Sequence, residues 1–317
     1  MKGLVTHHKN TALDTTLKIP SANRNEILVK IMAASVTSTD VAVSQGYYDM
    51  LFKLLGVRQP VKTGLEFSGI VIEGDTTFKH NDKVFGYVHL IRGPKTHQEY
   101  IAVPKNYIAH MPLSLSFEEA ASLPLGALTS LIALEELADV SIDDHVLING
   151  ASGGLGIHAV QIAKLLGAQV TAIAGPNQET FLSQLGANHI FNYQETPLQT
   201  LPSSSQFDVI FDLTTKLKFK GVQHLLSAKG IFVPTDPFKV MLDIASNVTR
   251  TKKTKYLMVT KGNQRKLRRI TKWVEDGKLN AFCDSVHLLS NHHEAFARSQ
   301  ISGKRGRVVL KIADNIT

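Results

Sequence analysis

The stretch from His145 to Gly167, HVLINGASGGLGIHAVQIAKLLG, restricts the fold of this chain more than any other part of its sequence. It begins with a short apolar run at 146–148, which is long enough for a buried strand. From Ile157 onward, apolar residues recur at helical spacing until Gly167 can end a helix. Residues 149–156, rich in glycine, lie between the two. The sequence therefore predicts a strand, a glycine turn and a helix, in that order.

The glycine turn matches a dinucleotide-binding motif in part. Measured against G-x-G-x-x-G, Gly153 and Gly156 are the second and third glycines, and Ala151 holds the first position. Glycines let the backbone approach a pyrophosphate, and the helix N-terminus offers free N–H groups to it. A turn that only packs a helix on a sheet is the alternative, but the flanking strand and helix favour dinucleotide binding. We expect the cofactor phosphates to contact Ser152, Gly153, Gly154, Leu155 and Gly156.

Composition limits the class of protein. A chain of 317 residues with 43% hydrophobic residues is long enough for two ordinary globular domains. Its only cysteine, Cys283, excludes an intrachain disulfide and a cysteine cluster that binds zinc. The N-terminus lacks the apolar core of a signal peptide, and no segment is typical of a membrane span. We expect a cytoplasmic protein without a transmembrane segment.

The pattern of apolar residues changes near residue 113. Residues 1–112 are β-rich, with short apolar runs separated by Gly, Pro, Asn and Asp. A capping box, Ser116-Phe117-Glu118-Glu119, then predicts the start of a helix. The tail 306–312 predicts a strand that returns to the first domain. We therefore expect one domain from 1–112 and 286–317, and a second from 113–285.

The second domain alternates strands with helices. Its clearest helices are predicted at 157–166, 178–185 and 263–275. Six candidate strands are Val146–Asn149, Val170–Ala174, His189–Asn192, Val209–Asp212, Gly230–Val233 and Tyr256–Val259. The expected fold class is α/β, with a Rossmann doubly wound parallel sheet in this domain.

Several separate stretches together resemble one family, the medium-chain dehydrogenase/reductases, and within it the zinc-independent quinone oxidoreductase branch. The matching stretches span nearly the whole chain in the family's order: Ala34-Ser35-Val36 leading to Asp40, Gly64–Gly69, Glu118–Pro124 with Thr129 after it, Gly150–Lys164, Leu185-Gly186-Ala187, Asn192-Tyr193 and Gly303–Leu310. The resemblance implies that the β-rich domain is a GroES-like catalytic domain.

The same resemblance implies that zinc is absent. Zinc-dependent relatives carry a Cys where this chain has Thr37 or its neighbour Ser38, and a His where it has Leu65. The cysteines of the family's structural zinc lobe are missing as well. The paired histidines His7-His8 and His292-His293 are interpreted as surface residues, because neighbours on a strand point to opposite faces.

The expected cofactor is NADP rather than NAD. An NAD enzyme usually has Asp or Glu at the end of the second strand, whereas 174–177 reads Ala-Gly-Pro-Asn, with no acid before Glu179. Tyr193 matches a phosphate-contacting tyrosine of NADPH-dependent relatives, although it is alternatively an ordinary strand tyrosine, and Gln178 stands where those relatives often have Lys. The cofactor contacts expected here are Ala174, Gly175, Asn177 and Tyr193, with Thr129 near the nicotinamide.

Without zinc to polarise a carbonyl, hydride transfer to a quinone or an enone is the favoured chemistry. By resemblance, Tyr48 lines the substrate cleft and is a candidate proton donor, and Thr37 and Asp40 line the catalytic pocket. The alternatives are that Tyr48 only packs while solvent supplies the proton, and that Asp40 caps a helix. Glu66 occupies the place of a carboxylate behind the zinc of other relatives, and is expected to be structural.

The net charge of +8 is concentrated at 250–278, which contains eleven Lys or Arg and only two acidic residues, Glu275 and Asp276. This segment suggests a different function, a nucleotide-binding protein that acts mainly on polyanions such as RNA or DNA. A solvated amphipathic helix is the favoured interpretation. A third alternative is that Lys252, Lys253 or Lys255 attracts an anionic substrate. The family resemblance also implies a homodimer, with Gly230–Pro234 as the expected edge of the paired sheets.

Overall fold

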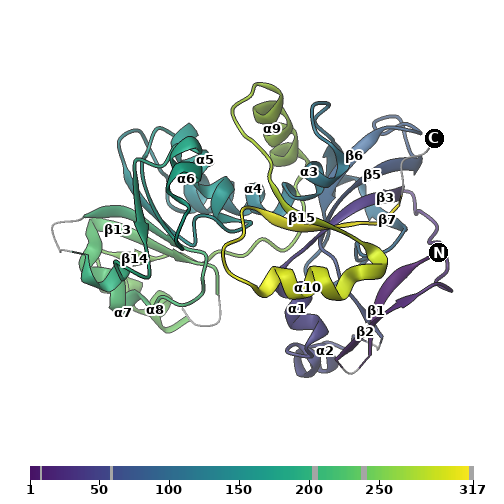
Figure 1. The fold of residues 1–317 in the computed structure, drawn as a ribbon, viewed down its shortest axis with the longest axis horizontal. Helices are drawn as coiled ribbons and strands as arrows, with labels where there is room; N and C mark the ends of the chain where they lie inside the picture. Colours follow the sequence, from purple (N-terminus) through teal and green to yellow (C-terminus); the bar gives the residue numbers. More distant parts are fainter. Residues whose placement is uncertain (8, 58–59, 202–205, 237–240, 314–317) are drawn as a thin grey trace. The chain divides into compact units, whose positions relative to one another are not determined.

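The computed structural model describes residues 1–317 except 8, 58–59, 202–205, 237–240 and 314–317 (Figure 1). Two compact units make up the chain: the first contains Met1–Leu125 and Thr260–Thr317, and the second contains Gly126–Val259. Within the described residues, every helix is too short or too polar to span a lipid bilayer. His8, one of the paired histidines, lies outside the described residues.

The first unit is built on two β-sheets, as the β-rich sequence predicts. The larger sheet has the order β15 (Cys283–Leu288), β16 (Arg307–Lys311), β3 (Glu26–Val36), β5 (Glu66–Glu73), β6 (Lys83–Tyr87) and β8 (Ile108–His110), and β7 (Tyr100–Pro104) pairs with β3. The smaller sheet has the order β2 (Asn10–Asp14), β1 (Gly3–His7) and β4 (Val61–Lys62). Because β16 pairs antiparallel with β3, the C-terminal strand returns to this unit as predicted.

Short helices surround these sheets. They are α1 (Ser38–Ser44), α2 (Asp49–Leu54), α3 (Phe117–Ala121), α9 (Gln264–Glu275) and α10 (His292–Gln300), with single turns η1 (Lys105–Tyr107) and η6 (Leu289–Asn291). α10 packs against β15 and β16 (Figure 1). The predicted capping box is present at the start of α3, where the Ser116 hydroxyl accepts the Glu119 N–H and the Glu119 carboxylate accepts the Ser116 N–H.

The second unit contains the predicted parallel sheet. Its strand order is β11 (His189–Asn192), β10 (Gln169–Ala174), β9 (His145–Asn149), β12 (Phe207–Asp212), β13 (Leu226–Pro234) and β14 (Lys253–Thr254). The accompanying helices are α5 (Gly156–Leu165), α6 (Glu179–Gln184), α7 (Phe219–Val222) and α8 (Met241–Ala245), with η2 (Ile132–Leu137), η3 (Leu198–Thr200), η4 (Gln223–Leu225) and η5 (Ser246–Val248). α4 (Pro124–Leu131) spans the boundary between the two units.

The apolar runs that predicted the strands form the core of this sheet. Val146, Leu147 and Ile148 of β9 are fully buried, as a central strand covered by helices on both faces requires. Leu147 also belongs to a cluster that includes Ile210 of β12 and Phe232 of β13. The α/β fold class with a doubly wound sheet is therefore confirmed.

The last strand of this sheet differs from the prediction. Residues 256–259 form no strand, and the sixth strand is the two-residue β14, which pairs with Ile231 and Phe232 of β13. β13 is therefore covered on its outer side, and the prediction that Gly230–Pro234 forms the sheet edge is wrong. The apolar character of 256–259 did not reveal that pairing begins before it, at a stretch of lysines and threonines.

The two units also divide the chain at different residues from those predicted. Residues 113–125 and 260–285 lie in the first unit, although the sequence placed them with the nucleotide-binding sheet. The predicted helix at 263–275 exists as α9, but it packs on β8, where the Thr271 hydroxyl donates to the His110 carbonyl oxygen at 3.0 Å. Helical periodicity shows that a face is buried, but not which sheet buries it.

Candidate cofactor and substrate sites

The glycine turn leaves the carboxyl end of β9 through a tight reversal at Gly150. Gly150 has φ +88°, a conformation that residues with a side chain rarely adopt. The N–H groups of Gly150 and Ala151 both donate to the Ile173 carbonyl oxygen on β10, each at 3.0 Å. The tight-turn role of the motif's first glycine therefore belongs to Gly150, one residue before Ala151, whose methyl group is fully buried.

Gly156 and Gly153 are glycines for different reasons. A Cβ atom on Gly156 would lie 2.2 Å from the Gly150 carbonyl oxygen and 2.5 Å from the Ala151 carbonyl carbon, so packing excludes any side chain. A Cβ atom on Gly153 would meet nothing closer than the Gly150 oxygen at 3.5 Å, which is ordinary contact. The internal packing of the turn therefore does not require glycine at 153. A ligand that approaches the backbone closely at this position would require it.

Helix α5 begins at the end of this turn without a side-chain cap. Its N-cap residue is Leu155, and no side chain accepts a hydrogen bond from the first N–H groups. The N–H groups of Gly153, Ile157 and His158 donate to the carbonyl oxygens of Gly150, Gly153 and Leu155. The positive end of the helix dipole favours an oxyanion at this point. The predicted contact residues Ser152, Gly153, Gly154, Leu155 and Gly156 all lie in this one segment.

The turn also lies at the switch point of the sheet. From β9 the chain continues to β10 and β11 on one side, and later to β12, β13 and β14 on the other. In an open parallel sheet the crevice at such a point, outside the carboxyl ends of the strands, is where ligands bind. The strand order therefore supports a ligand at the turn independently of the glycine motif.

Helix α4 packs directly against the glycine turn, through a residue that the sequence reasoning missed. A Cβ atom on Gly126 would lie 2.7 Å from the Gly154 carbonyl oxygen and 2.4 Å from the His158 ring, so only glycine allows this approach. Thr129 follows one helical turn later, on the same side of α4. Its side chain is 5% exposed. This packing brings the predicted nicotinamide contact close to the turn.

The residues expected to select the cofactor gather beyond β10. Gly175 lies beside the ring of Tyr193, whose N–H donates to the Ala174 carbonyl oxygen at 3.0 Å. The Tyr193 side chain is 46% exposed, and Asn177 is exposed with φ +60°. Gln178, by contrast, is buried. Tyr193 thus lies directly after β11 with about half of its side chain exposed, and its contact with the cofactor stays a prediction.

A polar network at the carboxyl ends of β9 and β12 escaped the sequence reasoning. The Asp212 Oδ1 atom accepts hydrogen bonds from Asn149 Nδ2 at 2.9 Å and from the Thr214 hydroxyl at 2.7 Å. Asn149 Nδ2 also donates to the Thr214 hydroxyl oxygen at 3.1 Å. These contacts fix the ends of the two strands that flank the crevice. An Asp at the end of an apolar run, followed by two threonines, is the signal that was present in the sequence.

In the first unit, Thr37 and Asp40 form a capping box at the start of α1. The Asp40 Oδ2 atom accepts the Thr37 N–H at 2.8 Å and its hydroxyl at 2.6 Å, while Oδ1 accepts the Gly64 N–H at 2.6 Å. Asp40 is 2% exposed. Its carboxylate is therefore saturated by donors that hold the loop at Gly64, which matches the capping alternative more closely than a role in proton transfer.

Tyr48 lies at the start of α2, within a small aromatic group. Its ring centroid is 5.1 Å from that of Tyr47 and 6.1 Å from that of Phe52. The Tyr48 side chain is partly exposed, whereas Tyr47 is 79% exposed. This placement is compatible with a phenol that faces a substrate, and its role in catalysis stays a prediction.

Glu66 is fully buried at the centre of the larger sheet. Its Oε1 atom lies 3.0 Å from Arg307 Nε and accepts the Ser35 hydroxyl at 2.5 Å, and Oε2 accepts the Leu125 N–H at 2.7 Å. Burial raises the pKa of this carboxyl, while Arg307 and the two hydrogen bonds act in the opposite direction. Both oxygens are engaged with protein groups, in agreement with the structural role expected for Glu66.

The histidine pairs need one correction. His292 and His293 begin helix α10 rather than a strand, and their ring centroids are 3.9 Å apart. His293 is exposed, but His292 is buried and its Nε2 atom lies 3.2 Å from the Thr11 carbonyl oxygen. Within the described residues, no three His, Cys, Asp or Glu side chains are grouped so that they could hold a metal ion.

The basic segment 250–278 is divided between the two units. Residues 250–255 belong to the second unit and 261–278 to the first. Lys252 Nζ donates to the Gln223 and Leu226 carbonyl oxygens at 2.7 and 2.6 Å, and Lys253 Nζ bonds to the Asn247 and Arg250 carbonyl oxygens. These lysines hold local backbone, so the arrangement favours a structural role over a continuous polyanion site. The exposed cations of α9 match the amphipathic helix that was favoured.

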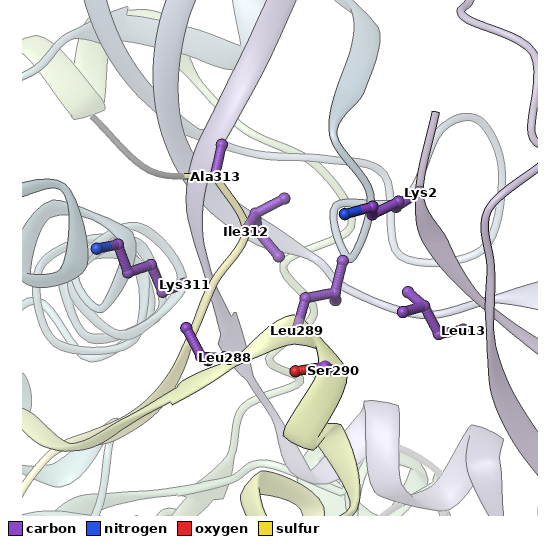
Figure 2. A pocket seen from close by; sticks show the side chains of 8 residues that line it. All are labelled: Lys2, Leu13, Leu288, Leu289, Ser290, Lys311, Ile312 and Ala313. Atoms are coloured by element: carbon purple, nitrogen blue, oxygen red, sulfur yellow. The ribbon is translucent and has the colours of Figure 1, made fainter. Parts of the chain in front are cut away.

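Two surface cavities are lined by residues of the first unit. One, of about 160 Å³, is shown in Figure 2, where Lys2 and Lys311 lie at its sides and Ser290 and aliphatic side chains form the rest of its wall. The second, of about 350 Å³, is lined by residues that include Lys83 and Phe117. Neither contains a predicted catalytic or cofactor-binding residue.

Comparison with known proteins covers both units. Residues 23–113 match the family described as alcohol dehydrogenase GroES-like domain, and residues 185–310 match the family described as zinc-binding dehydrogenase. The chain is 28% identical to the chloroplast envelope quinone oxidoreductase homolog of Arabidopsis thaliana, over 92% of each chain. It is 29% identical to the mitochondrial NAD(P)H oxidoreductase RTN4IP1 of Bos taurus, over 91% of this chain and 82% of that one. The solved structure of the quinone oxidoreductase from Coxiella burnetii superposes with a TM-score of 0.84 at 27% identity, over 99% of both chains.

Proposed function

We propose a function from one premise: this chain belongs to the medium-chain dehydrogenase/reductase family. Its relatives make it an oxidoreductase that uses a nicotinamide cofactor. Our proposal is that it transfers hydride from NADPH to a quinone or to an enone, without zinc. The observation that carries the proposal is the glycine turn at the switch point of the sheet, in a chain that aligns over nearly its full length with quinone oxidoreductases.

Zinc does not fit the residues that stand in the family's ligand positions. Thr37 is committed to the cap of α1, and Leu65 is an apolar side chain that is 2% exposed. The neighbouring carboxylate of Glu66 is engaged by Arg307 and by hydrogen-bond donors. Hydroxyl and aliphatic groups cannot replace the Cys and His that zinc prefers. We therefore include no zinc in the proposed reaction.

The two units contribute different parts of the proposed chemistry. When bound, a reduced nicotinamide supplies a hydride from its C4 atom. In the second unit, the N–H groups of Gly154, Leu155 and Gly156 would hold the pyrophosphate, with Thr129 beside the nicotinamide. In the first unit, the Tyr48 hydroxyl would donate a proton to the reduced acceptor, and the Thr37–Asp40 cap would position the loop at Gly64.

Reduction of a panel of acceptors tests this function. We expect purified protein to oxidise NADPH with quinones and conjugated ketones, and to retain its kcat after dialysis against EDTA. Saturated ketones should be poor acceptors, since without a Lewis acid their carbonyl group is not polarised. If no acceptor is turned over and RNA or DNA binds in a salt-sensitive manner, the polyanion-binding alternative replaces this proposal.

The cofactor preference is a separate prediction. We expect NADPH to bind about tenfold more tightly than NADH, because the end of β10 has no carboxylate to repel a 2′-phosphate and Tyr193 is available to contact it. Fluorescence titration of the two reduced cofactors measures both dissociation constants. Replacement of Tyr193 by Phe should reduce the preference by weakening NADPH alone. Tighter binding of NADH would contradict the assignment of NADP.

The role of Tyr48 is tested by removing its hydroxyl. Replacement of Tyr48 by Phe retains the ring contacts with Tyr47 and Phe52, and thermal unfolding of the variant checks its stability. If the phenol donates the proton, we expect kcat to fall about 100-fold with the KM for NADPH unchanged. Replacement of the exposed neighbour Tyr47 by Phe is the matched control. A change in kcat of less than about twofold for the Tyr48 variant would assign the proton to solvent.

We also propose that the protein is a cytoplasmic homodimer. Residues Gly230–Pro234 are no longer the proposed edge, because β14 lies outside β13. Light scattering after size-exclusion chromatography would give the number of chains, and a monomer at micromolar concentration would contradict the dimer.

A further inference from the structure

Two segments of the first unit that are far apart in sequence are joined by backbone hydrogen bonds. The Leu90 N–H donates to the Thr260 carbonyl oxygen at 2.7 Å, and the Gly262 N–H donates to the Tyr87 carbonyl oxygen at 2.9 Å. A Cβ atom on Gly262 would lie 2.5 Å from that Tyr87 oxygen, so a side chain would separate the two segments. Lys261 lies between these two anchors and is thereby held beside the loop that follows β6.

The loop itself is shaped by its own basic residues. His89 Nδ1 accepts the N–H groups of Ile91 and Arg92 at 3.1 and 3.2 Å, so the neutral ring carries its proton on Nε2 and can donate it outward. Lys95 Nζ donates to the His89 and Leu90 carbonyl oxygens at 2.7 and 3.2 Å. The ammonium group thus uses two of its three hydrogens to fix the loop.

These contacts bring four basic residues close together on two backbone segments: His89, Arg92, Lys95 and Lys261. Arg92 and Lys261 are exposed. Burial lowers the pKa of His89, and the charges of Lys95, Lys261 and Arg92 lower it further. Burial also lowers the pKa of Lys95 to about 8, and Asp40 partly opposes this effect. In the part of the chain that the structure describes, no salt bridge engages Arg92, Lys95 or Lys261. Lys261 has one further contact, with its ammonium 5.9 Å from the ring centroid of Tyr107.

A group of like charges held together by backbone contacts is electrostatically unfavourable unless an anion joins it. An oxyanion would accept the His89 Nε2–H and the hydrogens of Arg92 and Lys261, which are charge-assisted donors of the kind that bind carboxylate and phosphate. Lys95 would contribute by holding the loop in position. Asp40 is the acid that acts on Lys95 and offsets one positive charge. The charges of Arg92 and Lys261 are left without a salt bridge among the described residues.

We propose that His89, Arg92 and Lys261 form an oxyanion-binding site that receives the carboxylate or phosphate group of an acidic substrate. This assignment rests on the proposed reductase function and narrows its substrates from neutral quinones to acceptors that carry an anionic group. The site lies entirely within the first unit, in residues that the family resemblance did not include.

A pair of acceptors that differ only in charge tests the assignment. trans-3-Benzoylacrylate and its methyl ester share one enone, and only the first carries a carboxylate. With NADPH at constant ionic strength, we expect the wild-type protein to favour the acid in kcat/KM. Lys261→Gln and Arg92→Gln should each lower kcat/KM for the acid about tenfold and leave the ester unchanged. Lys229→Gln, an exposed lysine of the second unit, removes the same charge and should change neither value.

Inorganic phosphate separates failure of the site from failure of the function. Calorimetric titration of phosphate into wild-type protein and Lys261→Gln leaves the glycine turn intact in both, so the difference reports this cluster. Weaker binding to the variant supports the site even if neither enone is reduced, a result that would reject only the reductase. Equal phosphate binding and an unchanged ratio of acid to ester overturn the site. In a third outcome, phosphate binding depends on Lys261 but the wild type reduces the acid and the ester equally well. The site would then bind a free anion rather than the substrate, and the substrate proposal would be overturned.

Discussion

Gly153→Ala is expected to weaken NADPH binding about 100-fold while the melting temperature stays within about 1 °C of the wild type. The space around Gly153 explains both halves of this expectation: a Cβ atom there meets nothing closer than 3.5 Å, so the folded turn tolerates a methyl group. The same methyl group would collide with a bound pyrophosphate, because the pyrophosphate must approach the backbone at this point. Fluorescence titration with NADPH and thermal unfolding without cofactor measure the two effects separately.

Gly156→Ala is the matched control, and its behaviour should be the reverse. Its methyl group would collide with the backbone of Gly150 and Ala151, so the apo protein should lose stability by about 1–3 kcal/mol. A decrease in NADPH affinity would then follow from the damaged turn. If Gly153→Ala binds NADPH as tightly as the wild type, the cofactor phosphates do not contact the turn as proposed.

This pair of glycines also shows how far the sequence could lead. Spacing alone indicated that residues 149–156 lie between a strand and a helix, which the structure confirms. It could not separate a glycine required by packing from one that packing does not require, because that depends on which carbonyl groups lie opposite. For the same reason the spacing places Ala151 at the motif's first position and does not indicate that Gly150, with its positive φ, makes the tight turn.

The errors in the fold share a cause with the missed site residues. α9 was recognised from its periodicity but placed in the wrong unit, because an amphipathic helix does not specify the surface it covers. The cluster of His89 and Lys261 was missed because its two segments are about 170 residues apart and are joined by backbone hydrogen bonds, to which any residue except proline can contribute. The sequence indicates Asp40 as a candidate residue but leaves its role open, since a catalytic carboxylate and a helix cap can occupy the same position in a motif. Its three hydrogen-bond donors in the folded chain favour the helix cap.

Replacement of Glu66 is expected to have a large effect on the stability of the first unit. Its carboxylate and the Arg307 guanidinium are 0% and 7% exposed, so neither charge can be solvated if its partner is removed. We expect Glu66→Gln to lower the free energy of unfolding of the first unit by about 3–5 kcal/mol, because the Arg307 charge then stays buried without its counter-ion. Urea denaturation followed by fluorescence is suitable, since the only tryptophan, Trp273, lies on α9 in this unit.

The double variant Glu66→Gln with Arg307→Met distinguishes a charge effect from a packing effect. Removal of both charges should restore part of the lost stability, because no uncompensated charge remains. If Glu66 instead stood behind a catalytic zinc ion, its replacement would alter activity and sensitivity to chelators before stability. The residues around Glu66 do not favour a role next to zinc. Ser35, Leu125 and Arg307 already contact both carboxylate oxygens, and the aliphatic side chain of Leu65 cannot bind a metal ion beside them. We therefore expect the kcat of each folded Glu66→Gln molecule to be within about threefold of the wild type, and a loss of activity without a loss of stability would reject the structural role.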